Sequence, residues 1–268
     1  MKPFIVENGV NTCYIDSLLI ALFYIPSKTI SMLNNDLSNS HYIYLQEYIK
    51  HDFLGEVRAN LSVLAEVGEN IRNLSMHCGW HADLLDKTKD DYYSQRNVVD
   101  YFNFLLNLFR GPLIETVSEE VMKKDSYITL QIPNKTEPTN LNALLKHWSE
   151  SNRIVIGKNE SSYILALYLP RYVDKNVIRT PVDIPKKVKF KGSSILSHET
   201  EWKFYSAICY NVDNCRGGHY YTLISYNHKY YIFDDLKIPC LNEIDMKNKE
   251  ITSKLKTESV LMFYISCE

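Results

Sequence analysis

Residue types that together can perform nucleophilic catalysis occur near the two ends of the chain. Cys13 stands in NTCYIDSLLIALFY, residues 11–24, directly before an apolar run that stops at Pro26. His219 opens the stretch HYYTLISYNHKYYIFDD, which ends in two acids. A cysteine attacks as a thiolate, and a helix amino terminus together with a histidine promotes that state. These residues raise the hypothesis of a thiol nucleophile, against the alternative of an ordinary buried cysteine.

The residues after Cys13 favour a helix that begins beside the thiol. Asn11 and Thr12 are capping-type residues, and Pro26 ends the run. The apolar face of this helix comprises Leu18, Leu19, Leu22 and Phe23.

The histidine segment predicts a hairpin that brings His219 close to Asp234. Asn227-His228 marks a turn between two alternating strands, so the two side chains lie opposite or diagonal on one face. A carboxylate there would accept an imidazole N–H and leave the other nitrogen for a thiol. Gly217-Gly218 allows another backbone segment to approach the histidine. The alternative is that His219 only ends a strand and the acids cap a turn.

Composition narrows the class of protein. The chain has 268 residues and a net charge of -2, which gives no support to nucleic-acid binding. No signal-peptide pattern opens it, and no apolar run approaches the ~18–20 residues of a membrane span. Its six cysteines form no CxxC pair, so we expect reduced thiols. We therefore expect an intracellular monomer, in the cytoplasm, the nucleus or both, without a membrane partner.

The pattern of elements predicts an α+β fold in a single folded unit. Roughly the first 110 residues have helical periodicity, including a strong helix over 95–109. From about 125 onward, short runs rich in aromatic and β-branched residues predict strands, interrupted by a short helix over 139–148. Helices first and strands second are typical of this class.

Several motifs resemble those of the ubiquitin-specific proteases, a family of cysteine peptidases. ENGVNTCYIDSLLIALF resembles the family's cysteine box, and GGHYYTLI with YYIFDD resembles its histidine box. QRNVVDYFNFLLNLF is similar to a family helix that follows the pattern Q-Q-D-A-x-E-F. Further matches in family order are SYITLQIP, TNLNALLKHW, LPRYVDKNVIRTPVDIP and SVLMFYIS. The resemblance covers nearly the whole chain.

The resemblance implies a papain-like catalytic domain over residues 1–268, with a helical thumb over about 1–110 and a β-rich palm over about 111–268. It implies a thiol-dependent deubiquitinase that acts on the bond after the carboxyl-terminal glycine of ubiquitin and needs no cofactor or metal. The implied catalytic residues are Cys13 as nucleophile, His219 as base, Asp234 as its orienting partner, Asn8 as an oxyanion donor and Asp235 as a supporting acid. The implied substrate-binding positions are Gln95, Asn97, Gly218 and Tyr220.

Some positions depart from the family pattern. Asp16 stands where the family usually has asparagine, and an aspartate there resembles a divergent group directed at SUMO. The family's Q-Q-D reads Gln95-Arg96-Asn97, so the acid that holds ubiquitin's basic tail is absent. The paired CxxC motifs of a zinc-binding "fingers" extension are also absent, so we expect reduced fingers.

Two short motifs have alternative readings. MHCGWH, residues 76–81, could supply zinc ligands, although a local structure that packs Trp80 is favoured. PKKVKFK, residues 185–191, could be a nuclear signal, although a solvated basic strand is favoured.

Alternatives to a deubiquitinase stay open at this stage. One is an isopeptidase for SUMO or another ubiquitin-like modifier. Another is a catalytically inactive ubiquitin-binding module, which the presence of all four residues Asn8, Cys13, His219 and Asp234 disfavours.

Overall fold

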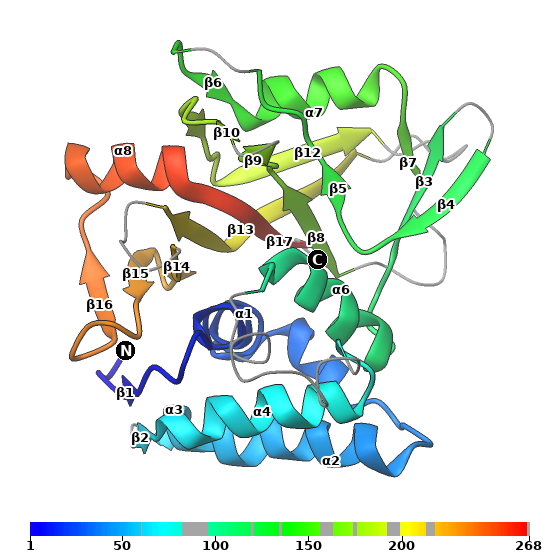
Figure 1. Ribbon diagram of the computed structural model, residues 1–268. Coiled ribbons are helices and arrows are strands. Elements are labelled where there is room, and N and C mark those ends of the chain that lie inside the picture. Colours follow the sequence, from blue (N-terminus) through cyan, green and yellow to red (C-terminus); the bar gives the residue numbers. More distant parts are fainter. Residues whose placement is uncertain are drawn as a thin grey trace. The chain divides into compact units, whose positions relative to one another are not determined.

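Helix α1, Cys13–Phe23, is buried along its whole length. Because it is apolar on nearly every face, it needs neighbours on all sides. It packs against helices α4 and α6 and against strand β14 (Figure 1). This computed structural model describes residues 1–59, 61–81, 96–118, 121–133, 136–155, 163–173, 176–191, 199–212 and 218–266.

The chain divides into two compact units, each built from two separate stretches of sequence. The first unit comprises Met1–Gly111 and Asn211–Ile244, and the second comprises Pro112–Tyr210 and Asp245–Glu268. The expected thumb ends near residue 110, whereas the first unit also includes Asn211–Ile244. The hairpin that carries His219, which we assigned to the palm, lies in the same unit as Cys13. The division into one catalytic domain with a thumb and a palm stays a prediction.

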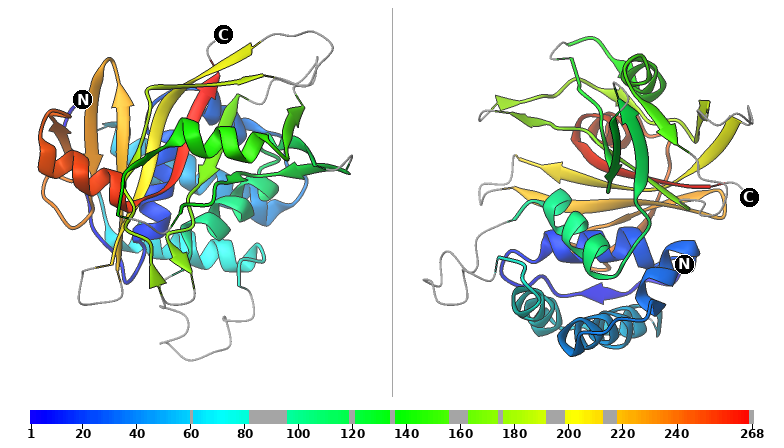
Figure 2. Two further views of the ribbon diagram at one scale, coloured as in Figure 1. Left: turned by 90° about the horizontal axis from the view of Figure 1, so that it is seen from above. Right: turned by 90° about the vertical axis from the view of Figure 1, so that its right-hand side faces the viewer.

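In the first unit, helices form most of the structure and one β-meander completes it. Helices α2 and α4 run side by side, and α1 lies on the other side of α4 (Figures 1 and 2). The helices are α1, η1 (Lys28–Asn34), α2 (Ser40–Tyr48), η2 (Ile49–Phe53), α3 (Leu54–Ala59), α4 (Ala65–His77) and α6 (Val98–Leu108). The strands are β1 (Ile5–Val6), β2 (Ser62–Val63), β14 (His219–Tyr226), β15 (Lys229–Phe233) and β16 (Leu241–Ile244).

Helix α6 confirms the strong helix predicted over 95–109. Its amino terminus is capped by Asn97, whose side-chain oxygen accepts a hydrogen bond from Val99 N at 2.8 Å. After the helix, a Cβ on Gly111 would lie only 2.5 Å from Leu106 Cδ1. Any larger residue would therefore require the side chain of Leu106 to shift where the chain folds back against α6.

The hairpin of β14 and β15 also confirms the sequence prediction. Tyr226 pairs with Lys229 and Thr222 pairs with Phe233, so a two-residue turn joins the strands. The turn residues Asn227 and His228 have positive φ angles of 48° and 64°. Such a turn matches the natural twist of a hairpin, which explains the tight connection.

The second unit is built mainly from strands. Its larger sheet has the order β13-β17-β8-β5, with β12 paired to β13, and a small sheet has the order β4-β3-β7. Its helices are α7 (Leu141–Ser149) and α8 (Lys249–Glu258), and α8 continues directly into β17 (Figure 2). The strands are β3 (Ile114–Ser118), β4 (Val121–Asp125), β5 (Ile128–Thr129), β6 (Thr139–Asn140), β7 (Arg153–Val155), β8 (Ile164–Tyr168), β9 (Tyr172–Val173), β10 (Asn176–Val177), β11 (Val182–Asp183), β12 (Lys187–Lys191), β13 (Glu199–Asn211) and β17 (Ser259–Ser266).

Several predicted elements of this unit are confirmed. Helix α7 matches the helix predicted over 139–148, and Asn140 caps it by accepting a hydrogen bond from Ala143 N at 2.8 Å. The basic run PKKVKFK contains strand β12, where Lys187 pairs with Glu201 at 2.5 Å. Helix α8 was not predicted, because its sequence KEITSKLKTE is polar and lacks a strong apolar face.

Membrane-spanning potential is confined to one pair of elements. Among the described helices, none alone is both long and apolar enough to cross a bilayer. A bent pair, Cys13–Phe23 with Lys28–Asn34, meets that test by length and composition only.

Candidate active site

Cys13 is the first residue of α1, and its side chain is 3% exposed. The residue before it, Thr12, does not cap the helix with its side chain, contrary to the expectation for a capping residue. Its hydroxyl instead accepts a hydrogen bond from Gly9 N at 3.0 Å and donates one to Asp16 Oδ2 at 2.8 Å. Thr12 therefore braces the loop before Cys13 against the first turn of the helix.

The ionisation of Cys13 differs from the sequence expectation. Burial raises the pKa of its thiol to about 12, and the backbone hydrogen bonds with Tyr220 and Tyr14 lower it only in part. The helix amino terminus was expected to lower this pKa, but the loss of water around the sulfur outweighs it. The backbone contact also shows that the thiol lies beside Tyr220, the residue that follows His219.

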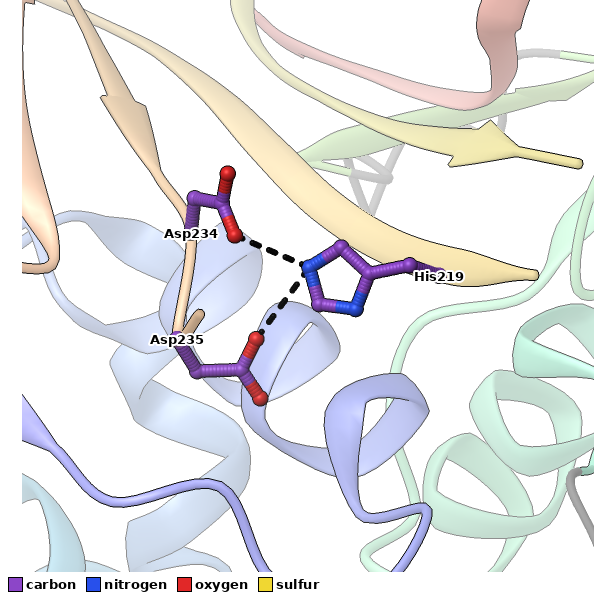
Figure 3. Close-up of side chains that lie close together, drawn as sticks. All are labelled: His219, Asp234 and Asp235. Carbon is purple, nitrogen blue, oxygen red and sulfur yellow. Dashed lines mark hydrogen bonds and ion pairs between the residues drawn. The ribbon is translucent and has the colours of Figure 1, made fainter. Parts of the chain in front are cut away.

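His219 is hydrogen-bonded to the acid predicted to be its partner. Its Nε2 lies 2.9 Å from Asp234 Oδ1 and 3.3 Å from Asp235 Oδ1 (Figure 3). Because the ionised carboxylate of Asp234 can only accept, Nε2 carries the hydrogen in the neutral ring and Nδ1 keeps its lone pair. Figure 3 shows Nδ1 turned away from both carboxylates. The predicted His219–Asp234 contact is thus present in the folded hairpin.

Asp234 is strongly ionised despite its burial. Burial alone would raise its pKa, but the hydrogen bonds with His219 and Lys237 outweigh that effect and lower the pKa to about 2. Lys237 Nζ lies 3.1 Å from Asp234 Oδ2. Leu236 N also donates to Asp234 Oδ1 at 3.2 Å. A permanent negative charge therefore stands at the Nε2 side of the imidazole.

The neighbours of His219 in sequence are placed at the site. Gly218 has a φ of 98°, a conformation that favours glycine, and it is half-buried. Tyr220 is buried, and its backbone reaches Cys13. Gly217 lies outside the described residues. Substrate binding by Gly218 and Tyr220 stays a prediction.

The other predicted site residues have different surroundings. Asn8 is half-buried in the loop between β1 and α1, five positions before Cys13. Asn97, predicted to bind substrate, has its side-chain oxygen engaged as the cap of α6. Gln95 lies outside the described residues, so its predicted contact with substrate stays a prediction.

Several residues of the site were not predicted as members. Asp16 is 1% exposed, and its carboxyl interacts with that of Asp235, which lies 3.3 Å from His219 Nε2. Arg72 on α4 is 1% exposed and faces Asp16, while one of its amino groups donates to Val10 O. The sequence feature that could have identified Asp16 as a site residue is its departure from the family pattern. An arginine on the apolar face of a helix, as Arg72 is, was a second one.

Some side chains of the site have atoms that can bind a metal ion. In the part of the chain that the structure describes, the one group of ligand atoms close enough to share a cation comprises His219, Asp234 and Asp235, all within 4.8 Å. Nε2 already donates its hydrogen to Asp234 there, so the group is an acid–imidazole hydrogen-bond network. In MHCGWH, Trp80 packs on Tyr101 with ring centroids 5.2 Å apart, which confirms the packing interpretation.

The whole sequence was compared with protein-family models. The model described as "Ubiquitin carboxyl-terminal hydrolase" matches residues 6–264. The chain belongs to the ubiquitin carboxyl-terminal hydrolase family. A direct sequence comparison with curated proteins gives no match.

Solved structures of similar fold agree with membership of the ubiquitin carboxyl-terminal hydrolase family. One is a chain of the SAGA DUB module Ubp8/Sgf11/Sus1/Sgf73 bound to monoubiquitin, with a TM-score of 0.67 at 15% identity, covering 100% of this chain and 69% of that one. Another is a chain of the same module bound to ubiquitin aldehyde, with a TM-score of 0.64 at 15% identity, covering 100% of this chain and 70% of that one. The predicted papain-like α+β fold and the predicted enzyme class are confirmed.

Proposed function

We propose that this hydrolase is a thiol-dependent deubiquitinase in which Cys13 is the nucleophile, His219 the general base and Asp234 the residue that orients the base. The observation that carries this proposal is the 2.9 Å hydrogen bond between His219 Nε2 and Asp234 Oδ1, next to a thiol that touches the backbone of Tyr220. This bond selects the tautomer whose Nδ1 can accept a proton from sulfur.

The chemistry follows from the ionisation states. The neutral Cys13 thiol gives its proton to His219 Nδ1 as its sulfur bonds to the carbonyl carbon of the terminal glycine of ubiquitin. The carbonyl oxygen becomes an oxyanion, which the side-chain amide of Asn8 stabilises. The charge of Asp234 stabilises the imidazolium that forms. His219 then returns the proton to the departing amine, and a thioester remains on Cys13.

Water completes the cycle. His219 takes a proton from the water as the water attacks the thioester carbonyl. The carbon–sulfur bond breaks and His219 returns this proton to the sulfur, and the new carboxylic acid loses its remaining proton to solvent as the terminal carboxylate of ubiquitin is released. These steps use protein side chains and water alone.

Ubiquitin is the modifier that the comparisons support. The chain belongs to a family described as acting on the ubiquitin carboxyl terminus, and its structural neighbours are described as bound to monoubiquitin and to ubiquitin aldehyde. Asp16, whose aspartate resembles that of a SUMO-directed group, is 1% exposed, so it presents almost no surface for direct contact with a modifier.

The test is covalent labelling with a ubiquitin whose carboxyl terminus carries a thiol-reactive group. We expect one adduct on the wild-type protein and none on Cys13→Ala. Cys78→Ala is the matched control, because Cys78 is also a buried cysteine with a raised pKa, yet should leave labelling intact. A SUMO probe that labels while ubiquitin does not would overturn the assignment of the modifier. Labelling that persists in Cys13→Ala would overturn the nucleophile.

A further inference from the structure

Two buried carboxyl groups beside the proposed base have more acceptor oxygens than donors. Asp16 is 1% exposed, and the side chain of Asp235 is 0% exposed. Among the described residues, Asp16 Oδ1 and both side-chain oxygens of Asp235 are buried without a hydrogen bond, and Asp235 Oδ1 has only the longer 3.3 Å ion-pair contact with His219 Nε2. Unsatisfied buried acceptors cost free energy, so native structures rarely retain them. A proton on one of the two carboxyl groups would supply a hydrogen bond between them.

The neighbouring hydroxyl cannot supply that hydrogen. Thr12 donates its only hydroxyl hydrogen to Asp16 Oδ2 at 2.8 Å and uses a lone pair to accept from Gly9 N. Asp16 Oδ1 is left, and the carboxyl of Asp16 interacts side chain to side chain with that of Asp235. Two carboxyl groups satisfy each other only when one of them is protonated.

The charges around Asp16 and Asp235 also favour one proton on the pair. Arg72 faces Asp16 and balances one negative charge, and Lys237 pairs with Asp234 at 3.1 Å. Burial raises the pKa of Asp235, and the negative charges of Asp16 and Asp234 raise it further. The groups that face the pair from the surrounding elements are Cys13, Arg72, Tyr101, His219, Asp234 and Cys240.

We propose that Asp16 and Asp235 share a single proton in the folded protein and that this acid pair positions and tunes Cys13 and His219. The shared proton joins α1, which carries Cys13, to the end of β15, which is followed by Asp234 and Asp235. The proposal deepens the proposed function and rests on it for its catalytic consequence, although the proton itself is present whether or not the protein hydrolyses ubiquitin.

The proton has two effects on the site. Negative charge on Asp235 and Asp16 opposes formation of the Cys13 thiolate, so holding one proton weakens that opposition. Asp235 Oδ1 also lies 3.3 Å from His219 Nε2, close to the 2.9 Å contact of Asp234. A neutral Asp235 competes weakly for the imidazole hydrogen, which keeps the ring aligned with Asp234.

The proton can be observed directly by carbon-13 NMR of aspartate carboxyl groups during a pH titration. We expect one carboxyl of the wild-type protein to stay protonated at neutral pH. That signal should be absent in Asp16→Asn and in Asp235→Asn, because the new amide donates the missing hydrogen. Asp100→Asn, an exposed acid on α6, is the matched control and should retain the signal. Titration of every wild-type carboxyl in the ordinary acidic range would overturn the proposal.

The catalytic consequence is tested by the pH profile of kcat/KM with a ubiquitin-derived fluorogenic substrate. In the wild-type protein, loss of the shared proton at alkaline pH restores the second charge, and we expect kcat/KM to fall about tenfold. Asp16→Asn should lack this fall in kcat/KM, because Asp235 then faces an amide and shares no proton. Asp100→Asn should keep the fall. The same fall in Asp16→Asn would overturn the tuning role. Absence of all hydrolysis would count against the proposed function, and the NMR result would still decide the shared proton.

Discussion

At the scale of single residues, the ionisable groups of the site are shifted in opposite directions. The pKa of Asp234 is lowered to about 2 by its donors, and burial raises the pKa of Cys13 to about 12. In the resting protein the carboxylate is therefore charged and the thiol is neutral. The thiol must lose its proton during attack. The rate therefore depends on the His219 tautomer whose Nδ1 can accept that proton.

Replacing Asp234 by asparagine should remove most of the activity. The amide of Asp234→Asn can donate to Nε2, which moves the ring hydrogen to Nδ1 and blocks proton transfer from the thiol. We expect kcat to fall by about 10²–10⁴-fold, with KM nearly unchanged. Steady-state kinetics with a ubiquitin substrate measure both constants. A rise in KM alone would show that Asp234 acts on binding and not on the base.

Asn8→Ala tests the proposed oxyanion donor. The loop that holds Asn8 is tied to α1 by the Gly9–Thr12–Asp16 hydrogen bonds, so the truncation should not disturb Cys13. Loss of one such donor lowers kcat by about 10²–10³-fold. Single-turnover kinetics should show the loss in formation of the thioester. An unchanged acylation rate would remove Asn8 from the mechanism.

Sequence patterns were sufficient for part of this site. The Asn227-His228 turn sets the register of the hairpin, so the His219–Asp234 contact follows from local spacing. The burial of Cys13 and the pairing of Asp16 with Asp235 depend on contacts between distant segments, which spacing does not encode. The raised pKa of the thiol and the acid pair could therefore not be predicted.

At the scale of elements, Asn97 illustrates how one residue can suit two roles. The family resemblance made it a substrate-binding position, and the fold uses its side chain to cap α6. Because Asn97 is exposed, its side chain is accessible both for capping α6 and for contact with a substrate. Strong periodicity was enough to predict α6, whereas the polar helix α8 depends on its surroundings and was missed.

Asn97→Ala separates the two roles. We expect the variant to lose about 1 kcal/mol of unfolding free energy, because the amide of Val99 at the start of α6 loses its side-chain cap. Asn97→Asp is the matched control, since it keeps the cap and adds a charge favourable at a helix amino terminus. Urea denaturation measures the loss, and KM for ubiquitin measures the binding role. Unchanged stability together with a raised KM would contradict the capping role.

At the scale of the whole molecule, the buried acid pair links stability to pH. The folded protein holds one proton that the unfolded chain releases at the ordinary pKa of aspartate, so rising pH favours unfolding. Between about pH 5 and pH 8, uptake of this proton on folding lowers the free energy of unfolding by up to ~1.4 kcal/mol for each unit of rising pH. Asp234 has a lowered pKa, so its contribution to the free energy of unfolding is present at higher pH. That contribution is lost only as pH falls toward about 2, outside this window.

Asp16→Asn should flatten that dependence. In this variant Asp235 stays ionised between about pH 5 and pH 8, so the protein takes up no proton at this site when it folds. Urea denaturation at about pH 5, 6.5 and 8 gives the slope for both proteins. Equal slopes for the variant and the wild-type protein would show that the pair is not the proton-binding group.

The discontinuous first unit has a consequence for synthesis on the ribosome. Thr222 Oγ1 on β14 donates to Ser17 O on α1 at 2.8 Å, and the two residues are 205 positions apart. The helix that carries the proposed nucleophile is thus completed by a hairpin translated near the end of the chain. A nascent chain exposes Cys13 early, but it lacks the base His219 and its orienting partner Asp234 until those residues have emerged. We expect truncated translation products to be unable to act on the modifier carried by neighbouring proteins.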